Sequence, residues 1–195
     1  MMAVQRFGFE SLPAVPWKNG GGVTREIVCR PAGAAIGDFD WRVSIAAIVA
    51  NGPFSAFPGI DRVITLLDGG GVRLRSRDGA IDHRLDTPLA PFAFAGELAI
   101  DAELLGDCRD LNVMTRRSAC RARVQVARAD GELPPAGAGL LFAARGAWRA
   151  LNTAGDLQPL ATGAGLWWDG PAMAWRLNGS DPGAALVAVL VERSR

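Results

Sequence analysis

Glycine and proline interrupt this chain along its whole length, and that pattern constrains its fold most. The sequence has 24 glycines and 12 prolines in 195 residues, and they do not gather into one linker. The segments between them have strand length and either alternate polar with apolar residues or are briefly apolar. None keeps the helical period of about 3.6 residues over several turns. The sequence therefore predicts an all-β fold, a sandwich or a barrel.

Two further segments carry expectations about local structure. We expect one short helix near Ile100–Leu105, in the run AIDAELL. The run GELPPAGAG, Gly131–Gly139, predicts a long surface turn. It separates a first part dense in polar motifs from a second part rich in Ala, Gly, Leu and Trp. We expect one compact unit with approximate halves 1–130, which carries the motifs, and 131–195, a smaller β half.

Overall composition excludes several classes of protein. Hydrophobic residues make up 49%, charged residues 21%, and the net charge is +1. This balance excludes a disordered chain and gives no general field for nucleic acid or anionic membranes. The apolar run Ala184–Val191 is too short to span a bilayer, and the N-terminal residues lack a secretory signal. We expect a cytoplasmic protein that binds neither nucleic acid nor membrane.

The residues needed for metal and nucleophile chemistry are scarce. Cys29, Cys108 and Cys120 are widely spaced, which predicts reduced structural thiols. The only histidine, His83, is expected on an exposed hairpin arm, and one histidine cannot supply a typical transition-metal site. Lys18 is the only lysine, and no phosphate loop or nucleophile elbow is present. We expect no metal and no cofactor.

A glycine-rich segment, PWKNGGG, precedes a predicted strand that begins Thr-Arg-Glu. In it Trp17 can stack on a planar ligand, Lys18 supplies a cation, and Asn19 both donates and accepts hydrogen bonds. The glycines allow the backbone to approach a ligand. An ordinary turn explains the same residues equally well. In the strand that follows, Arg25 and Glu26 lie on opposite faces, and we place Glu26 toward the pocket.

Strand alternation assigns further side chains to a cavity wall. Period two places Arg42 and Ser44 on one face and their apolar neighbours on the other. In the segment 110–117 the same period places Asp110, Asn112, Met114 and Arg116 on one face. A mixed polar face that includes methionine is more typical of a cavity wall than of a solvated surface.

Two aromatic segments supply the remaining candidates. In GPFSAFPGIDR, Phe54 and Phe57 can wall a pocket beside the Ser55 hydroxyl. Arg62 either enters that pocket or forms a local ion pair with Asp61 of little consequence. The segment PFAFAGE adds Phe94 and ends in the carboxylate of Glu97.

Taken together, these motifs resemble those of the HutD/Ves family. PWKNGGGVTREI, FDWRVSIAAI, GPFSAFPGIDRVITLLDGGG, PFAFAGE and LLGDCRDLNVMTRR match in order and spacing over residues 14–118. The later part matches mainly in its strand pattern. The resemblance implies a cupin-like β-barrel (an RmlC-like jelly roll), a double cupin in one compact chain, and a link to histidine utilisation. It also implies a homodimer paired through strand edges.

The same resemblance shows what this chain lacks. Many cupins bind metal through an HxH pair, a following Glu and a later His. The segments here that resemble the two cupin motifs have no histidine at those positions. The pocket is therefore expected to work with organic side chains alone.

Intermediates of histidine breakdown are small carboxylates, so a receptor needs an arginine, amide or hydroxyl groups, and aromatic walls. The residues that supply these groups are our candidate ligand-binding residues: Trp17, Lys18, Asn19, Glu26, Arg42, Ser44, Phe54, Ser55, Phe57, Arg62, Phe94, Glu97, Asn112 and Met114.

Two functions remain open from the sequence. The first is a binding protein that senses or sequesters a carboxylate metabolite and modulates histidine catabolism without turnover. The second is a metal-independent isomerase or hydrolase, with Glu97 or Glu26 as general base if burial raises its pKa, and Arg42 as electrostatic stabiliser. The absence of metal ligands and of a nucleophile–base pair favours binding over catalysis.

A third class, a module for an anionic partner, rests on one group of arginines balanced by acidic residues elsewhere. The group is Arg116, Arg117, Arg121, Arg123 and Arg128.

Overall fold

The computed structural model describes residues 4–194, and within them the regular structure is almost entirely β. The elements in chain order are β1 (Gln5–Gly8), the 3₁₀ turn η1 (Phe9–Ser11), β2 (Ala14–Pro16), β3 (Gly22–Arg30), β4 (Trp41–Ile48), β5 (Gly52–Pro53), β6 (Ile60–Ser76), β7 (Asp82–Leu85), β8 (Pro91–Ala95), β9 (Ile100–Arg116), β10 (Cys120–Ala127), β11 (Gly131–Arg145), β12 (Trp148–Asn152), β13 (Leu157–Leu160), β14 (Ala164–Gly179) and β15 (Ala185–Arg193). The predicted all-β fold is confirmed.

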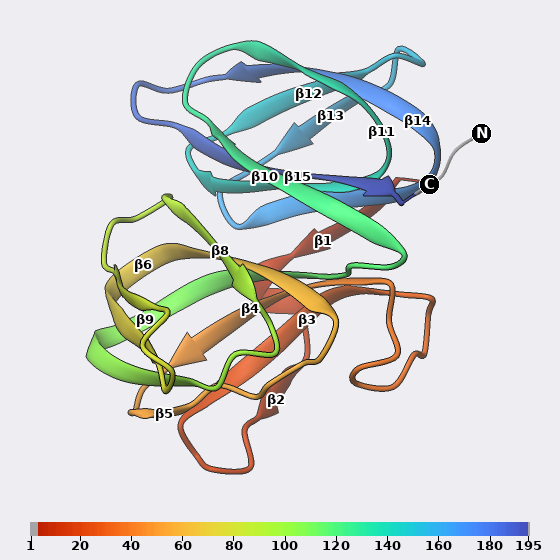
Figure 1. Ribbon diagram of the computed structural model, residues 1–195. Helices are drawn as coiled ribbons and strands as arrows, with labels where there is room; N and C mark the ends of the chain where they lie inside the picture. The colour runs from red at the N-terminus through yellow and green to blue at the C-terminus, as the bar shows by residue number, and fades with distance from the viewer. Residues whose placement is uncertain (1–3, 195) are drawn as a thin grey trace. The chain divides into compact units, whose positions relative to one another are not determined.

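The strands form two sheets, which belong to two compact units of the chain (Figure 1). The unit Pro13–Arg121 contains the sheet β2-β3-β4-β9-β6-β7, in which β5 also pairs with β9 and β8 with β6. The unit formed by residues 4–12 and Ala122–Arg193 contains the sheet β10-β15-β11-β14-β12-β13, in which β1 also pairs with β14. Each sheet is an open path of paired strands, as in a jelly roll, and not a closed ring.

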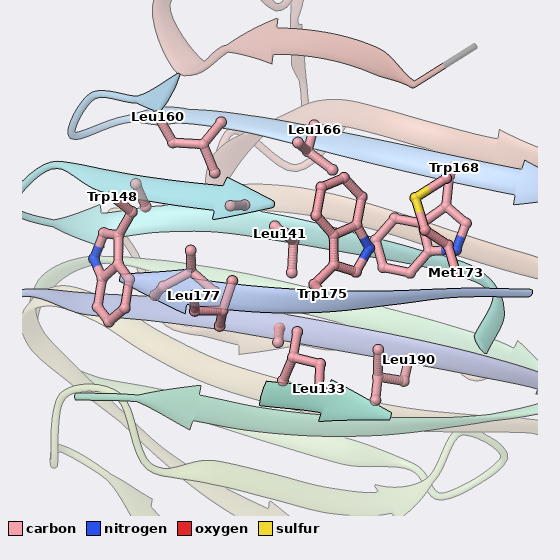
Figure 2. Close-up of a cluster of buried hydrophobic side chains, with 14 of the residues drawn as sticks. Leu133, Leu141, Trp148, Leu160, Leu166, Trp168, Met173, Trp175, Leu177 and Leu190 are labelled. Carbon is pink, nitrogen blue, oxygen red and sulfur yellow. The ribbon is translucent and has the colours of Figure 1, made fainter. Parts of the chain in front are cut away.

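The Ala122–Arg193 unit is filled by an apolar core (Figure 2). Trp168 and Trp175 are each 1% exposed, and their rings lie 5.4 Å apart at a tilted angle. The Trp168 indole N–H donates to the carbonyl of Ala136 at 2.9 Å. The side chains of this cluster are apolar, so burial of this core stabilises the unit.

The Pro13–Arg121 unit is organised by two long antiparallel strands, β6 and β9. Their register shifts between Leu66 and Asp68 and again near Gly71, so that β6 pairs with β8 before the shifts and with β7 after them. Such irregularities bend a strand and increase its twist. The two parts of β6 therefore have different partners on the side away from β9.

Two local predictions were wrong. The expected helix near Ile100–Leu105 is the first part of β9, where Ala102 lies opposite Leu74 of β6. The expected surface turn Gly131–Gly139 is the first part of β11, where Leu133 lies opposite Trp175. Sheet pairing outweighs local preference in both segments. The prolines of GELPPAGAG fall at a register shift after Leu133, where the loss of a ladder hydrogen bond is tolerated.

No helix within residues 4–194 has the length and apolar character needed to cross a membrane.

Candidate functional site

One face of the Pro13–Arg121 sheet carries polar side chains in adjacent rows. Arg42 of β4 lies opposite Met114 of β9, and Met114 lies opposite Arg62 of β6. In the next row Ser44 lies opposite Asn112. Because directly opposed residues point to the same face, these side chains lie together.

We call the four polar residues of these rows, together with Glu26, the polar belt: Glu26, Arg42, Ser44, Arg62 and Asn112. Glu26 joins it from β3, where it lies opposite Ser44.

Apolar clusters flank the polar belt on this face. Phe39, Ile60 and Met114 form a small buried cluster. A larger cluster includes Ile64 and Phe94, with other buried residues of β4, β6 and β9. The belt is therefore set among apolar side chains and is not an ordinary solvated surface.

Arg62 is the most enclosed charged side chain of the belt. It is 6% exposed, and its guanidinium carbon lies 5.1 Å from the ring centre of Phe54, 5.8 Å from that of Phe57 and 5.0 Å from that of Phe94. Rings at these distances attract a cation electrostatically. Burial lowers the pKa of Arg62 to about 10, which still leaves the side chain charged at neutral pH.

The hydrogen-bond donors of Arg62 have only weak acceptors. Its Nε donates to Oδ1 of Asn112 and its Nη1 to the backbone carbonyl of Ser55, both at 3.5 Å. Among residues 4–194, no carboxylate lies within ion-pair distance of this guanidinium. Asp110 acts on Arg62 electrostatically but makes no ion pair with it. A buried charge without a contacting counter-ion is costly, so this position favours an anionic ligand.

Arg42 presents a second cation at the edge of the belt. Its Nε donates to Oε2 of Glu26 at 2.6 Å, and its Nη1 approaches Oγ of Ser44 at 3.5 Å and the sulfur of Met114 at 3.9 Å. The Arg42 side chain is 17% exposed and that of Glu26 is 47% exposed. Glu26 therefore orients Arg42 from the solvent side, while Nη1 of the guanidinium faces Ser44 and Met114.

Asp110 is a buried acid that our sequence analysis placed on this face but did not select. It lies two residues before Asn112 on β9, is 2% exposed, and its Oδ1 has no hydrogen-bond partner in residues 4–194. Burial raises the pKa of Asp110 to about 7, although the positive charge of Arg62 opposes this shift. The period of two in the segment 110–117 placed Asp110 on the same face as Asn112, but no local feature of the sequence indicated that its side chain is buried.

The structure places the glycine-rich segment outside the belt. The Trp17 indole N–H donates to Oγ1 of Thr24 at 2.8 Å, and its ring packs against the larger apolar cluster. Oδ1 of Asn19 accepts from the backbone N–H of Gly21 at 3.0 Å. Lys18 is exposed. These contacts are those of a turn.

Glu97 has the opposite environment from the one a general base requires. It is exposed, and Arg117 donates to both of its carboxylate oxygens at 3.1 Å. These hydrogen bonds hold the pKa of Glu97 below its usual value. Arg117 also pairs with Asp61 at 2.7 Å, so the local ion pair between Asp61 and Arg62 that we considered from the sequence does not form.

Other expected groups also lie away from the belt. Ser55 is an exposed residue, and its contact with Arg62 is made by its backbone carbonyl. His83 is half-buried on β7 with its ring stacked on Phe92 at 3.7 Å, so the expected exposure is wrong. In the part of the chain from residue 4 to 194, no three His, Cys, Asp or Glu side chains are grouped to hold a metal ion.

A hollow of about 390 Å³ borders two of the residues that surround Arg62, and none of the residues that line it belongs to the polar belt. These two residues are Phe57, whose ring lies near the Arg62 guanidinium, and Ser55, whose carbonyl accepts from it. The hollow is lined by Ile36, Gly37, Ser55, Ala56, Phe57, Pro58 and Ile60.

Comparison with known proteins identifies the family. The family model described as HutD matches residues 10–187. The chain is 42% identical over 169 residues to Protein Ves of Citrobacter koseri, which covers 86% of this chain and 84% of that protein. Two solved structures resemble the whole chain. One is a conserved protein of unknown function from Pseudomonas aeruginosa, with 35% identity, a TM-score of 0.86 and coverage of 97% and 99% of the two chains. The other is HutD from Pseudomonas fluorescens, solved in a formate condition, with 30% identity, a TM-score of 0.85 and coverage of 99% and 100%.

A cupin 2 conserved barrel domain protein from Leptotrichia buccalis shares the fold at 9% identity, with a TM-score of 0.61 and 98% coverage of both chains. The predicted cupin-like fold is therefore confirmed. Since the family model spans most of the sequence and its relatives match at high coverage, this chain belongs to the HutD family.

Proposed function

We propose that this chain binds a small carboxylate metabolite at the polar belt and thereby modulates histidine utilisation, without metal and without turnover. The observation that carries the proposal is the buried guanidinium of Arg62, which has aromatic walls but no carboxylate partner in residues 4–194. A carboxylate would accept charge-assisted hydrogen bonds from it and neutralise its charge. Asn112 and Ser44 supply amide and hydroxyl groups beside this position.

The link to histidine utilisation rests on the family and on the relative named HutD. It determines which acids are tested first, namely urocanate, N-formylglutamate and glutamate. Acetate serves as the smallest member of the panel.

The alternative, a metal-independent isomerase or hydrolase, has less support. It needs a desolvated carboxylate as general base. Neither base expected from the sequence meets this need, because Glu97 is exposed and bound by Arg117, and Glu26 is already paired with Arg42. The buried carboxyl group on this face is that of Asp110, which lies between the apolar residues Ala46 and Leu66, two rows from Arg62.

The binding proposal is tested by calorimetric titration of the four acids. We expect saturable binding of at least one acid at millimolar concentration or below, and loss of that binding in Arg62→Met. The control is Arg176→Met, because Arg176 is an exposed arginine paired with Glu132 in the other unit. Failure of every acid to bind the wild type, or equal binding by Arg62→Met, contradicts the proposal.

The regulatory part is tested separately in the organism. Replacement of the chromosomal copy by the Arg62→Met variant should alter growth on histidine as sole nitrogen source. Growth identical to the wild type, with the variant protein present at normal levels, contradicts a regulatory role.

A further inference from the structure

Asp110 is a buried carboxyl group that the proposed binding of a carboxylate leaves without a role. It projects from the same face of β9 as Asn112, one row farther from Arg62. Its neighbours in that row, Ala46 and Leu66, are apolar and belong to the larger buried cluster. One of its oxygens has no hydrogen-bond partner in residues 4–194.

The protonation of Asp110 decides the net charge of the polar belt together with Asp110, the set of residues that we call the pocket. Arg42 and Arg62 contribute two positive charges, and Glu26 contributes one negative charge. With Asp110 neutral, the pocket has an unbalanced positive charge that an anion can neutralise. With Asp110 ionised, the protein supplies that negative charge itself and also repels an incoming carboxylate across a medium of low polarity.

We propose that the pocket takes up its carboxylate ligand together with one proton, which Asp110 holds. This inference rests on the proposed function and adds a regulation of the same site. When Asp110 is ionised, the anion binds beside Arg62 and a proton from solvent binds a carboxylate oxygen of Asp110. No bond in the ligand is made or broken. When Asp110 is already neutral, the anion binds without proton uptake.

The surroundings of Asp110 favour proton uptake at this one carboxyl group when the ligand binds. The titratable and charged groups on its own and the neighbouring strands include Arg62 on β6, Arg42 on β4, Glu26 on β3, Cys108 on β9, and His83 on β7, which is stacked on Phe92 of β8. Of these, Arg62 is the one whose charge acts on the pKa of Asp110. The Cys108 thiol has its own pKa raised to about 11 by burial and stays neutral throughout the physiological range.

The test is the affinity for acetate as a function of pH. Acetate is chosen because it carries one charge and no other titrating group between about pH 6 and pH 9. We expect a constant Kd below the pKa of Asp110, near 7, and a rise of up to about tenfold per pH unit above it. Calorimetry at about pH 8 in two buffers of different ionisation enthalpy should show uptake of close to one proton per acetate.

Asp110→Asn keeps the size and shape of the side chain and removes its charge. We expect its Kd for acetate to be independent of pH and, at about pH 8, up to about tenfold lower than that of the wild type. The matched control is Asp101→Asn on the same strand, at an exposed residue paired with Arg77. This control should keep the pH dependence of the wild type.

The outcomes separate the two proposals. A flat Kd in the wild type, with no proton uptake, overturns the proton linkage and leaves carboxylate binding intact. Absence of saturable acetate binding in both the wild type and Asp110→Asn at about pH 6 also overturns the linkage, and the proposed function fails only if the other three acids fail as well. The buffer experiment uses the wild type, so the test does not depend on the folding of Asp110→Asn.

Discussion

Arg62 contributes a positive charge to the interior of the Pro13–Arg121 unit, and its long side chain also fills space between three phenylalanine rings. Replacement by methionine keeps most of that volume and removes the buried charge. We expect the free energy of unfolding of Arg62→Met to stay within about 1 kcal/mol of the wild type or to rise, even though acid binding is lost. Urea denaturation measures this difference.

Arg62→Ala leaves a cavity and should be less stable than Arg62→Met. A large loss of stability in both variants would indicate that the charge is structural.

Asp110 also predicts how stability depends on pH. Its pKa in the folded protein, about 7, is above the ordinary value of 3.8, so the folded state holds a proton that the unfolded state releases. Stability therefore falls as the pH rises from about 4 to about 7, by up to about 1.4 kcal/mol per unit, and is level above that range. In Asp110→Asn this contribution should be absent.

The measurement is urea denaturation of both proteins between about pH 4.5 and pH 8. Exposed acids whose pKa values are lowered, such as Glu97 and Asp82, lose their contribution at lower pH and in both proteins alike. Parallel curves for wild type and Asp110→Asn would show that Asp110 does not titrate in this range.

Single residues also show how far the sequence could predict the site. Alternation placed Arg42 and Ser44 on one face and Asn112 and Met114 on one face, and the structure joins those faces through strand pairing. Alternation is a local property, so it could assign a face but not a partner. The partner of Glu97 is Arg117, which follows the last residue of β9, and no local pattern connects them.

At the scale of elements, the all-β pattern was predictable because most strands alternate over their own length. The start of β9 was not, since AIDAELL reads as a helix until it is paired with β6 over Leu74–Ser76. The start of β11 was also hidden, because two prolines and three glycines in GELPPAGAG indicate a turn. Both segments owe their strand conformation to partners distant in sequence.

The bend in β6 depends on a close backbone approach at Gly71. This glycine has a φ of 86°, and a Cβ there would meet the carbonyl oxygen of Leu85. We expect Gly71→Ala to lower the free energy of unfolding by more than about 2 kcal/mol, because it adds both a steric clash and an unfavourable φ. Thermal or urea denaturation measures the effect.

Gly79→Ala is the matched control for Gly71→Ala. Gly79 has a φ of 77°, but a Cβ there would have no neighbour within 4 Å. The control carries the backbone strain alone and should cost about 1 kcal/mol. Equal losses in the two variants would show that the close approach to Leu85 does not matter.

At the scale of the whole chain, the two units differ in what their sheets hold. The Ala122–Arg193 unit has a core of leucines and tryptophans, whereas the Pro13–Arg121 unit sets charged side chains between two apolar clusters. The pairing of β1 with β14 also brings the N-terminal strand into the unit with Ala122–Arg193. No local pattern in Gln5–Gly8 indicates this pairing, because its partner residues lie far away in the sequence, in β14.

This division predicts where a bound acid changes the dynamics of the chain. At a hundredfold excess over its Kd, a ligand stabilises the folded state by about 2.7 kcal/mol. Because the polar belt lies on β3, β4, β6 and β9, added acetate at about pH 6 should slow hydrogen exchange first in the local openings of these strands. Peptides from β11, β12 and β14, which surround the tryptophan core, should change least.

Arg62→Met provides the control, because it should show no acetate-dependent protection in any peptide. Raising the pH to about 8 should weaken the protection in the wild type but not in Asp110→Asn, since only the wild type must gain a proton to bind. Protection centred on β11 and β14 would place the acid in the other unit and would contradict both the site and its coupling to Asp110.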